Sequence, residues 1–243
     1  MDWPKAKNIL IIALIATNLF LLWSIFSSHQ GDFQKEDLRR ETEALLLENG
    51  IALSCEIPQG YKKVAVLSVL YDDQTGSFDY TPHQTPQAPP LTEETARQTA
   101  DAFLTREGLM TQTTEFFGVR PSQQIPGQYL VSYKNIFDGI EIEGCFILCT
   151  VSPEGVVHMQ RQWLTPLEYG KNKGSLIPAT TALLSFLSEH PQNQPITITD
   201  ISLVYKLDSP YQEMSEVSAD TAFPMWRITC GSGEIFYQQA FEK

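Results

Sequence analysis

Two glutamates, Glu141 and Glu143, are the residues in this sequence whose type and spacing come closest to a chemical site. They stand two positions apart in a run that reads as a strand, so their side chains would share one face of a sheet. Two neighbouring carboxylates carry out glycoside hydrolysis, one as the acid and the other as the base or nucleophile. The pair also follows the Asp138-Gly139 turn, where the outer face of a hairpin is normally in water. We therefore expect two solvated glutamates, with a catalytic carboxylate pair as the alternative.

No recognised enzyme motif accompanies this pair, because G-x-S-x-G, H-E-x-x-H, S-x-x-K and the P-loop are all missing from the sequence. The four histidines fall in a membrane-proximal stretch, a proline-rich stretch, a strand and a helix end: His29, His83, His158 and His190. We interpret each as a surface polar residue. The sequence thus predicts no catalytic residues, no metal site and no cofactor.

Four large aromatic residues and four cysteines complete the residues that could form a site. The aromatic residues lie in strand-like runs and are expected in the core or on a sheet face, with a binding groove as the alternative: Tyr133, Trp163, Tyr205 and Trp226. Four cysteines allow three pairings, which the sequence cannot distinguish: Cys55, Cys145, Cys149 and Cys230. Cys145 and Cys149 would be about 13 Å apart along a strand, too far to bridge each other. Free buried thiols are the simplest interpretation.

The charge balance restricts the classes of partner. The formal net charge is −12, and residues 1–31 contribute +1 through Lys5, Lys7 and Asp2, which leaves −13 on the remainder. This acidity argues against binding to nucleic acid and against simple adhesion to anionic lipids or wall polymers. A hydrophobic content of 42% favours a packed core over disorder.

One uncharged segment near the N-terminus determines where the rest of the chain would lie. Residues 9–26 read ILIIALIATNLFLLWSIF, and a helix of this length would be about 27 Å long, close to a hydrocarbon core of about 30 Å. Lys5 and Lys7 precede it, so the positive-inside rule places residues 1–8 in the cytoplasm and the large remainder outside. A cleaved signal peptide is the alternative, but the run is long and no A-x-A-like site follows it.

The predicted transmembrane helix carries a face suited to contact with another helix. Ala13 and Thr17 fit the small-xxx-small pattern that lets helices approach closely in lipid, and Asn18 lies near the centre of the bilayer. We predict that Ala13, Thr17 and Asn18 contact a partner in the membrane. The alternative is that such residues are tolerated without a role, because Thr and Ser can bond their own backbone.

Hydrophobic periodicity and turn residues predict an α+β ectodomain after this helix. Helices are expected at 33–49, 93–107 and 176–188, with Asp32 and Thr92 as caps and Pro178 at the first position of the third helix. Strands are expected at 61–72, 116–119, 129–137, 140–151, 156–164, 197–207, 223–230 and 234–240. Residues 78–80 are expected to pair back on the first strand, 81–90 to form a proline-rich linker, and 211–222 to form a loop.

A helix followed by an antiparallel meander occurs twice in this arrangement. The Asp138-Gly139 dipeptide between 129–137 and 140–151 is the strongest hairpin signal in the chain. We predict an N-terminal α+β part at 27–90, which includes the linker, and a C-terminal part at 91–243. The C-terminal part would contain two helix-plus-meander units, at 91–165 and 175–243.

Several short segments resemble the YycI family in the same order along the chain. The N-terminal Met1–Lys7 and the end of the apolar run, Asn18–Leu22, are similar to the start of that family. The later segments are Phe137–Ile142, Met159–Leu164, Leu176–Ala179, Pro224–Ile228 and Gln239–Glu242. The likeness covers most of the chain, whereas the region Gly50–Pro90 matches nothing in the family pattern.

The resemblance implies a non-enzymatic, single-pass membrane protein that regulates an essential two-component system of wall homeostasis. Its expected partners are a YycH-like accessory protein and a WalK-like sensor histidine kinase, reached through ectodomain and transmembrane contacts. No catalytic residue can be carried over from the family. The alternative function is an extracytoplasmic module, similar to PepSY-like domains, that binds a peptide or protease on its sheet face.

Overall fold

The computed structural model describes residues 36–59, 64–81, 91–190, 195–208 and 219–241, together with Leu14, Thr17 and Asn18. These residues form an α+β fold dominated by one mixed sheet of eleven strands. Residues 36–48 are helical, and two further helices are α2 (Glu93–Arg106) and α3 (Ala179–Glu189). The predicted α+β class is therefore confirmed for the described part of the chain.

The strands are unequal in length, and the long ones lie in the second half of the chain. They are β1 (Ile51–Leu53), β2 (Ala65–Tyr71), β3 (Gly76–Asp79), β4 (Thr114–Pro121), β5 (Tyr129–Phe137), β6 (Ile140–Ser152), β7 (Gly155–Gln162), β8 (Leu164–Lys173), β9 (Ile196–Leu207), β10 (Ala219–Cys230) and β11 (Ile235–Gln239).

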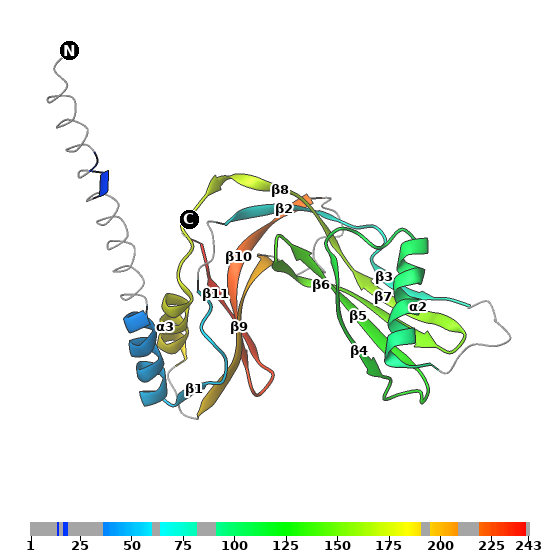
Figure 1. Cartoon of the computed structure of the whole chain (residues 1–243), viewed down its shortest axis with the longest axis horizontal. Helices are drawn as coiled ribbons and strands as arrows, with labels where there is room; N and C mark the ends of the chain where they lie inside the picture. The colour runs from blue at the N-terminus through cyan, green and yellow to red at the C-terminus, as the bar shows by residue number, and fades with distance from the viewer. Residues whose placement is uncertain are drawn as a thin grey trace, which may run out of the picture.

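The sheet bends into an arch with a lobe at each end (Figure 1). The α2 lobe contains the antiparallel strands β4, β5, β6, β7 and β3, with α2 on one face. The α3 lobe contains β1, β9, β10, β11, β2 and β8, and α3 and the helical segment 36–48 lie beside each other there. Strands β2 and β3, adjacent in sequence, thus belong to different lobes.

A short parallel pairing between β6 and β9 connects the two lobes. Glu141 pairs with Val204 and Ile142 with Tyr205, while the second half of β6 pairs with β5 and β7. Gly144 separates the two halves of β6 and has a φ of 78°. Glycine adopts this left-handed conformation without the steric cost of a Cβ, so β6 can change direction there.

The start and end of α2 follow the local sequence signals. Thr92 caps the helix, because its side chain accepts from the backbone N–H of Thr95 while the Thr95 hydroxyl accepts from the N–H of Thr92. Gly108 has a φ of 71° and follows the last turn. The buried residues of α2 recur at helical spacing and form its inward face: Ala96, Ala100, Phe103 and Leu104.

The Asp138-Gly139 hairpin is confirmed as well. Asp138 and Gly139 have φ values of 50° and 78°, as a two-residue type I′ turn requires. Phe137 pairs with Ile140 directly across this turn. The dipeptide fixes the register of β5 against β6, and with it the face on which every side chain of the hairpin lies.

Several strand assignments differ from those predicted. Residues 78–80 were expected to pair back on the preceding strand, but β3 pairs with β7, and β2 pairs with β8 and β10. Strand β8 was not predicted because its sequence, TPLEYGKNK after Leu164, is polar as an edge strand can be. Strand β1 was missed because three residues show no periodicity, and β10 begins at Ala219 inside a predicted loop.

The start of α3 also differs in detail. Pro178 is the N-cap and not the first helical residue, with φ −59° and ψ 148°. The residues before it are attached to the sheet: Leu176 bridges to Phe241, and the carbonyl of Ile177 accepts a 2.8 Å hydrogen bond from Trp226 Nε1. These contacts hold the chain extended up to Pro178, so the helix begins one residue later.

The core contains the large aromatic residues, as predicted. Each of them is at most 1% exposed: Tyr133, Trp163, Tyr205 and Trp226. All four cysteines are unpaired, and three of them are buried: Cys145, Cys149 and Cys230. Burial raises the pKa of Cys145 and of Cys149 to about 12, so both thiols stay protonated and behave as apolar core groups.

Candidate functional site

The two glutamates that the sequence offered as a possible catalytic pair are bound to an arginine from the other lobe. Arg227 on β10 lies 3.0 Å from Glu141 and 2.9 Å from Glu143, nitrogen to oxygen. Lys134 on β5 lies 2.9 Å from the same Glu141 oxygen. The expectation of two solvated glutamates is therefore wrong, because β9 and β10 follow β6 in the sheet and bring Arg227 beside them on the same face, which the local sequence does not reveal.

These four residues, Lys134, Glu141, Glu143 and Arg227, form what we call the interlobe ion cluster. The side chains of Arg227, Glu141 and Glu143 are only 14%, 15% and 20% exposed. Burial by itself would lower the pKa of Arg227, but hydrogen bonds and charge from Glu141 and Glu143 raise it above its ordinary value. The cluster carries two positive and two negative charges, so it is neutral overall and can be partly buried between the two lobes.

Further polar side chains attach this cluster to its surroundings. Arg227 Nε donates to the Ser202 hydroxyl on β9 at 3.2 Å. Lys134 lies 3.9 Å from the centre of the Phe117 ring on β4. Burial and the nearby Glu143 raise the pKa of Tyr237 on β11, so this hydroxyl remains a hydrogen-bond donor. Since Arg227 occupies both carboxylates, neither is available as a general acid or base for a substrate.

The tip of the β5–β6 hairpin makes a second contact between the lobes. The Tyr169 hydroxyl on β8 donates to the Asp138 carboxylate, and the rings of Phe137 and Tyr169 lie 5.3 Å apart. Within the α3 lobe, Tyr205 on β9 donates to the carbonyl of Ala65 at 3.2 Å. Through Asp138 and Phe137, the hairpin reaches from the α2 lobe onto β8, so its turn makes a tertiary contact besides setting the register.

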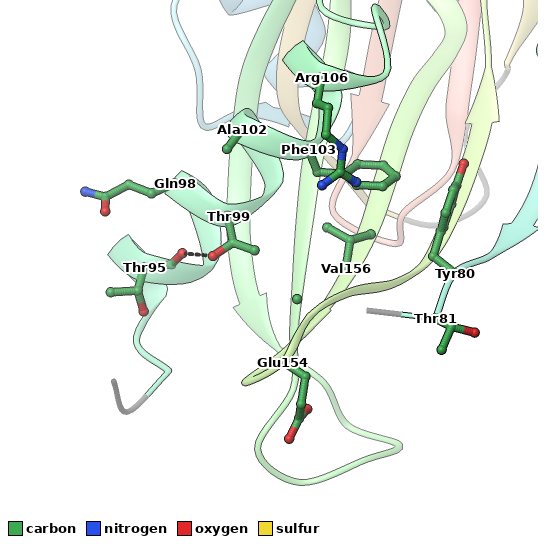
Figure 2. A pocket seen from close by; sticks show the side chains of 11 residues that line it. Tyr80, Thr81, Thr95, Gln98, Thr99, Ala102, Phe103, Arg106, Glu154 and Val156 are labelled. Atoms are coloured by element: carbon green, nitrogen blue, oxygen red, sulfur yellow. Dashed lines mark hydrogen bonds between the residues drawn. The ribbon is translucent and has the colours of Figure 1, made fainter. Parts of the chain in front are cut away.

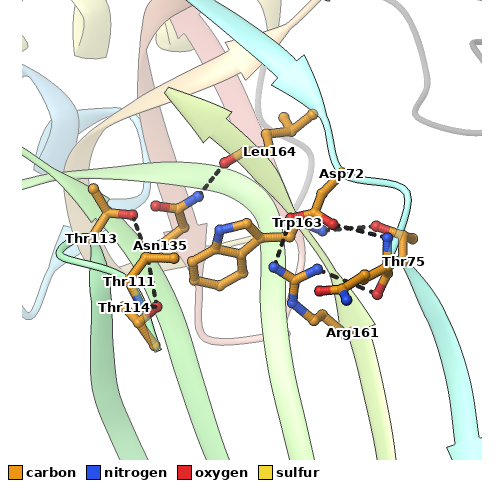
Figure 3. Close-up of polar contacts among 10 residues, drawn as sticks. Asp72, Thr75, Thr111, Thr113, Thr114, Asn135, Arg161, Trp163 and Leu164 are labelled. Carbon is orange, nitrogen blue, oxygen red and sulfur yellow. Dashed lines mark hydrogen bonds and ion pairs between the residues drawn. The ribbon is translucent and has the colours of Figure 1, made fainter. Parts of the chain in front are cut away.

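A buried polar network lies at the end of β7, where the chain passes into β8 (Figure 3). Arg161 is 3% exposed and donates to Asp72 at 2.8 Å and to the carbonyl of Gln74 at 3.3 Å. Trp163 lies between Arg161 and Asn135 in Figure 3, with the guanidinium 5.4 Å from its ring. Asn135 donates to the Leu164 carbonyl at 2.6 Å. This network fixes the crossing between the lobes and is structural.

A cavity of about 940 Å³ lies between α2 and the β6–β7 turn. Figure 2 shows Phe103 and Arg106 pointing from α2 towards Tyr80 and Val156. The rings of Tyr80 and Phe103 meet edge to face at 4.7 Å, and Arg106 lies 5.4 Å from the Phe103 ring. The polar lining consists of Thr81, Thr95, Gln98, Thr99, Arg106 and Glu154. Arg106 is paired with Glu107, and the Glu154 carboxylate accepts a hydrogen bond from the Ser152 hydroxyl at 2.8 Å.

A second cavity of about 760 Å³ lies on the sheet face opposite α2, under the β4–β5 loop. His158 is at its edge, where its Nδ1 lies 2.7 Å from Asp79 and its Nε2 3.2 Å from the Ser77 hydroxyl. The connectivity Ser–His–Asp is that of a catalytic triad. The Asp79 side chain is 93% exposed, however, and Ser77 lies in a regular strand and not on a strained turn. Neither group has the buried, oriented setting of a nucleophilic site.

The remaining histidines take other places. His190 stacks on Phe186 at 4.6 Å and meets Phe236 at 4.5 Å, ring centre to ring centre, so it packs against the core and is not a plain surface residue. His29 and His83 lie outside the described residues. Within the described part of the chain, no group of three acidic, histidine or cysteine side chains could hold a metal ion.

The predicted membrane contact residues are only partly described. Thr17 and Asn18 are helical and exposed, and Ala13 lies outside the described residues, as does most of segment 9–26. No helix among the residues that the structure describes is long and apolar enough to cross a bilayer.

Sequence reasoning missed Arg227 and Arg161, which hold the two buried polar clusters. Arg161 is the single charge of β7, two positions before Trp163, and a charge at a buried strand position requires a partner. Arg227 stands between the buried Trp226 and Ile228 on β10, where alternation predicts the outer face, so the local pattern did not mark it. The partner's identity could not be found in this way, since Glu143 is 84 residues from Arg227.

Comparisons with known proteins identify one family. The family model described as YycI protein matches residues 33–241. No curated protein matches the chain. An uncharacterised protein from Eubacterium rectale is 14% identical with a TM-score of 0.43; the match covers 65% of this chain, which spans about half (53%) of that protein. The C-terminal domain of Bacillus megaterium YpeB is 10% identical with a TM-score of 0.33, covering 84% of this chain and 97% of that one. At these TM-scores neither structure carries an argument about function.

Proposed function

The chain belongs to the YycI family, and on that premise we propose that it is a non-enzymatic, membrane-anchored regulator of a two-component system that controls cell-wall homeostasis. The family as such is linked to two-component regulation. The match over residues 33–241 is the observation that carries the proposal. The proposed partners are a WalK-like sensor histidine kinase and a YycH-like accessory protein.

The proposed topology is a single span at residues 9–26, with residues 1–8 in the cytoplasm and the folded part outside the cell. The apolar run and its flanking Lys5 and Lys7 support this orientation. We also propose that 91–165 and 175–243 are structural units, to which the segment 27–90 adds β3 on one side and β1 and β2 on the other. The packing of α2 on β4–β7 and of α3 on β11 supports two such units.

The fold provides a connection from the helical segment 36–48, which follows the proposed anchor in the sequence, to the far lobe. The helical segment 36–48 leads into β1, which pairs in parallel with the start of β9. The other end of β9 pairs with β6, where the interlobe ion cluster lies. A partner that favours one arrangement of the lobes would bias the anchor, and therefore the kinase, by its difference in binding energy between the arrangements.

We place the transmembrane contact at Ala13, Thr17 and Asn18. Small side chains allow close helix approach in lipid, and an asparagine amide gains from a partner across the contact, by about 0.6 kcal/mol on average. The exposed, helical positions of Thr17 and Asn18 are consistent with such a face.

The test is to replace Ala13, Thr17 and Asn18 together by Leu, which preserves apolar length but fills the small face. We expect reduced co-purification with the kinase and changed signalling output, at an unchanged level of protein in the membrane. A matched control replaces Ile11, Ile12 and Ile15 by Leu, which changes side-chain shape without adding bulk. If the first variant behaves as this control does, the contact model fails.

A second candidate function, the binding of a peptide on the sheet face, is favoured by a specific observation. The face of the α2 lobe opposite α2 carries a cavity of about 760 Å³ that no described helix covers. Ligand sites of this size bind small molecules and short peptides. This function is compatible with regulation, because a bound peptide would be a natural input to a signalling protein.

A further inference from the structure

The open face of the α2 lobe presents a row of five side chains that crosses every strand of that lobe. The strand registers align Arg120 with Leu130, Leu130 with Thr150, Thr150 with His158, and His158 with Asp79. Residues directly opposite in a sheet lie on the same face. The row therefore has a cation at one end, an anion at the other, and uncharged or weakly basic residues between them.

The length of this row follows from strand spacing. Four intervals of about 4.8 Å separate Arg120 from Asp79, which gives roughly 19 Å between their Cα atoms. An extended peptide rises about 3.3 Å per residue, so five or six residues span the distance. All five residues of the row line the 760 Å³ cavity, so the charged ends belong to one continuous hollow.

Neither charged end is neutralised by a full ion pair within the described residues. Arg120 is exposed and has no acidic partner in the part of the chain that the structure describes. Asp79 contacts only the imidazole of His158, and its side chain is 93% exposed. By contrast, Arg106 beside the other cavity is paired with Glu107. The open face thus has two complementary charges available for a ligand.

A buried acceptor inside the same hollow points to a ligand that donates hydrogen bonds. The Oε1 atom of Gln128 is buried and has no hydrogen-bond partner among the described residues, although Gln128 lines the cavity. An unsatisfied buried acceptor costs about 1–3 kcal/mol, and a donor from a ligand removes that cost. A peptide backbone offers such N–H donors at every residue.

The β4–β5 loop that covers this hollow is held by its own hydrogen bonds. The Ser122 hydroxyl accepts from the backbone N–H groups of Gln124 and Ile125, at 3.3 and 3.2 Å. The Ser122 N–H donates to the carbonyl of Gln128 at 2.8 Å. The wall is therefore formed before any ligand binds, which reduces the entropic cost of binding.

We propose that this hollow binds a short extended peptide of five or six residues with both termini free, its carboxylate on Arg120 and its ammonium group on Asp79. Leu130, Leu148 and Thr150 then form the floor under small or apolar side chains, and Gln128 accepts from the peptide backbone. A zwitterionic peptide has no net charge, so the formal charge of −12 does not repel it. The proposal deepens the peptide-binding candidate and does not depend on the membrane contacts, so the regulatory proposal survives its failure.

The experiment uses the full chain in detergent and three hexapeptide pools randomised at the four central positions. One pool has free termini, one is N-acetylated and one is C-amidated, each at about 1 mM total peptide, where weak complexes still form. Equilibrium dialysis followed by mass spectrometry measures the peptide that the protein retains. We expect the free pool to be retained, and each cap to weaken the best binders about tenfold, since one charge-assisted contact is lost.

Variants then assign the ends. Arg120→Gln should weaken binding of the free peptides about tenfold and leave binding of the amidated peptides unchanged, because those have no carboxylate to lose. Asp79→Asn should likewise weaken binding of the free peptides about tenfold and leave binding of the acetylated peptides unchanged. Arg106→Gln, a surface arginine at the other cavity, is the matched control and should change nothing. Because all three positions are exposed, folding should be retained, and the thermal midpoint checks it.

The proposal is overturned by any of three results. The first is that the protein retains no more of the free pool than detergent alone does. The second is that the free and capped pools are retained equally. The third is that Arg106→Gln weakens peptide binding while Arg120→Gln does not. The last result would move the peptide to the cavity beside α2.

Discussion

Arg227 on β10 donates a hydrogen bond to Glu143 on β6 at 2.9 Å, across the boundary between the two lobes. The same guanidinium reaches Glu141, so one arginine holds two acidic residues of the opposite lobe. Within the described residues, two residue pairs connect β6 to β9 by backbone pairing. The relative position of the lobes therefore depends on side-chain contacts as well, namely the ion cluster, the Arg161 network and the contact of Asp138 with Tyr169.

Replacing Arg227 should destabilise the protein strongly. Arg227→Leu leaves Glu141 and Glu143 largely buried without their main partner, which we expect to cost about 3 kcal/mol. Arg97→Leu is the matched control, because its pair with Asp101 is exposed and 3.7 Å long, and it should cost less than about 1 kcal/mol. Thermal unfolding of the full chain measures both. A triple variant, Glu141→Leu, Glu143→Leu and Arg227→Leu, should recover part of the lost stability.

Equal losses of stability in Arg227→Leu and Arg97→Leu would contradict a special role for the interlobe ion cluster.

The pair between Asp72 and Arg161 should make stability depend on pH in the acid range. A hydrogen bond from Arg161 lowers the pKa of Asp72, against the opposing effect of burial. A carboxylate whose pKa is lowered by folding stabilises the native state above its unfolded pKa of about 4, and loses this effect as the pH falls through the lowered value. Asp72→Asn should therefore be less stable than wild type at pH 7, with the difference narrowing below pH 4. A difference that stays constant down to pH 2 would exclude this linkage.

The buried thiols should be chemically inert in the folded protein. Burial raises the pKa of Cys145 and of Cys149 to about 12, and the reactive thiolate is then negligible at neutral pH. Cys55 is only half-buried, so a reagent reaches it more readily, although burial and the nearby Asp200 raise its pKa as well. With iodoacetamide at pH 8, we expect Cys55 to react first and the other three only after unfolding. Peptide mapping identifies the labelled positions, and Cys55→Ser should remove the early labelling.

The Ser77–His158–Asp79 chain should show no esterase chemistry. The solvated Asp79 and the extended backbone at Ser77 lack the orientation that activates a serine. A fluorophosphonate probe should leave Ser77 unmodified at a concentration that labels trypsin fully. If the probe modifies Ser77 in the wild-type protein but not in His158→Ala, the result would support a catalytic serine instead.

Local signals in the sequence were sufficient for the elements whose geometry is local. Asp138-Gly139 specifies a type I′ turn because both positions adopt positive φ, and the hairpin formed where it was predicted. Thr92 begins α2 and Gly108 ends it because a side-chain acceptor and a residue without Cβ satisfy the helix ends. Alternating apolar residues likewise placed β2, β5 and β6.

Pairings between distant segments could not be read in this way. β3 was expected to return to the strand beside it, yet it joins β7 in the other lobe, because Phe78 is packed into the core of the α2 lobe. Likewise, Glu141 and Glu143 looked solvated because their nearest neighbours in sequence form a turn. The strand that supplies their partner Arg227, β10, begins about 75 residues later.

The sequence by itself determined the α+β class, the acidic character, the two ends of α2 and the β5–β6 turn of this protein, since the charge depends on composition and the other features on residues close together in sequence. Only the tertiary structure decided which strands adjoin, that Arg227 neutralises the glutamate pair, and that Arg120 and Asp79 lie at opposite ends of one hollow. Those relations depend on which strands pair and in which register, and the strands come from distant parts of the chain. No pattern within a short segment determines such pairings.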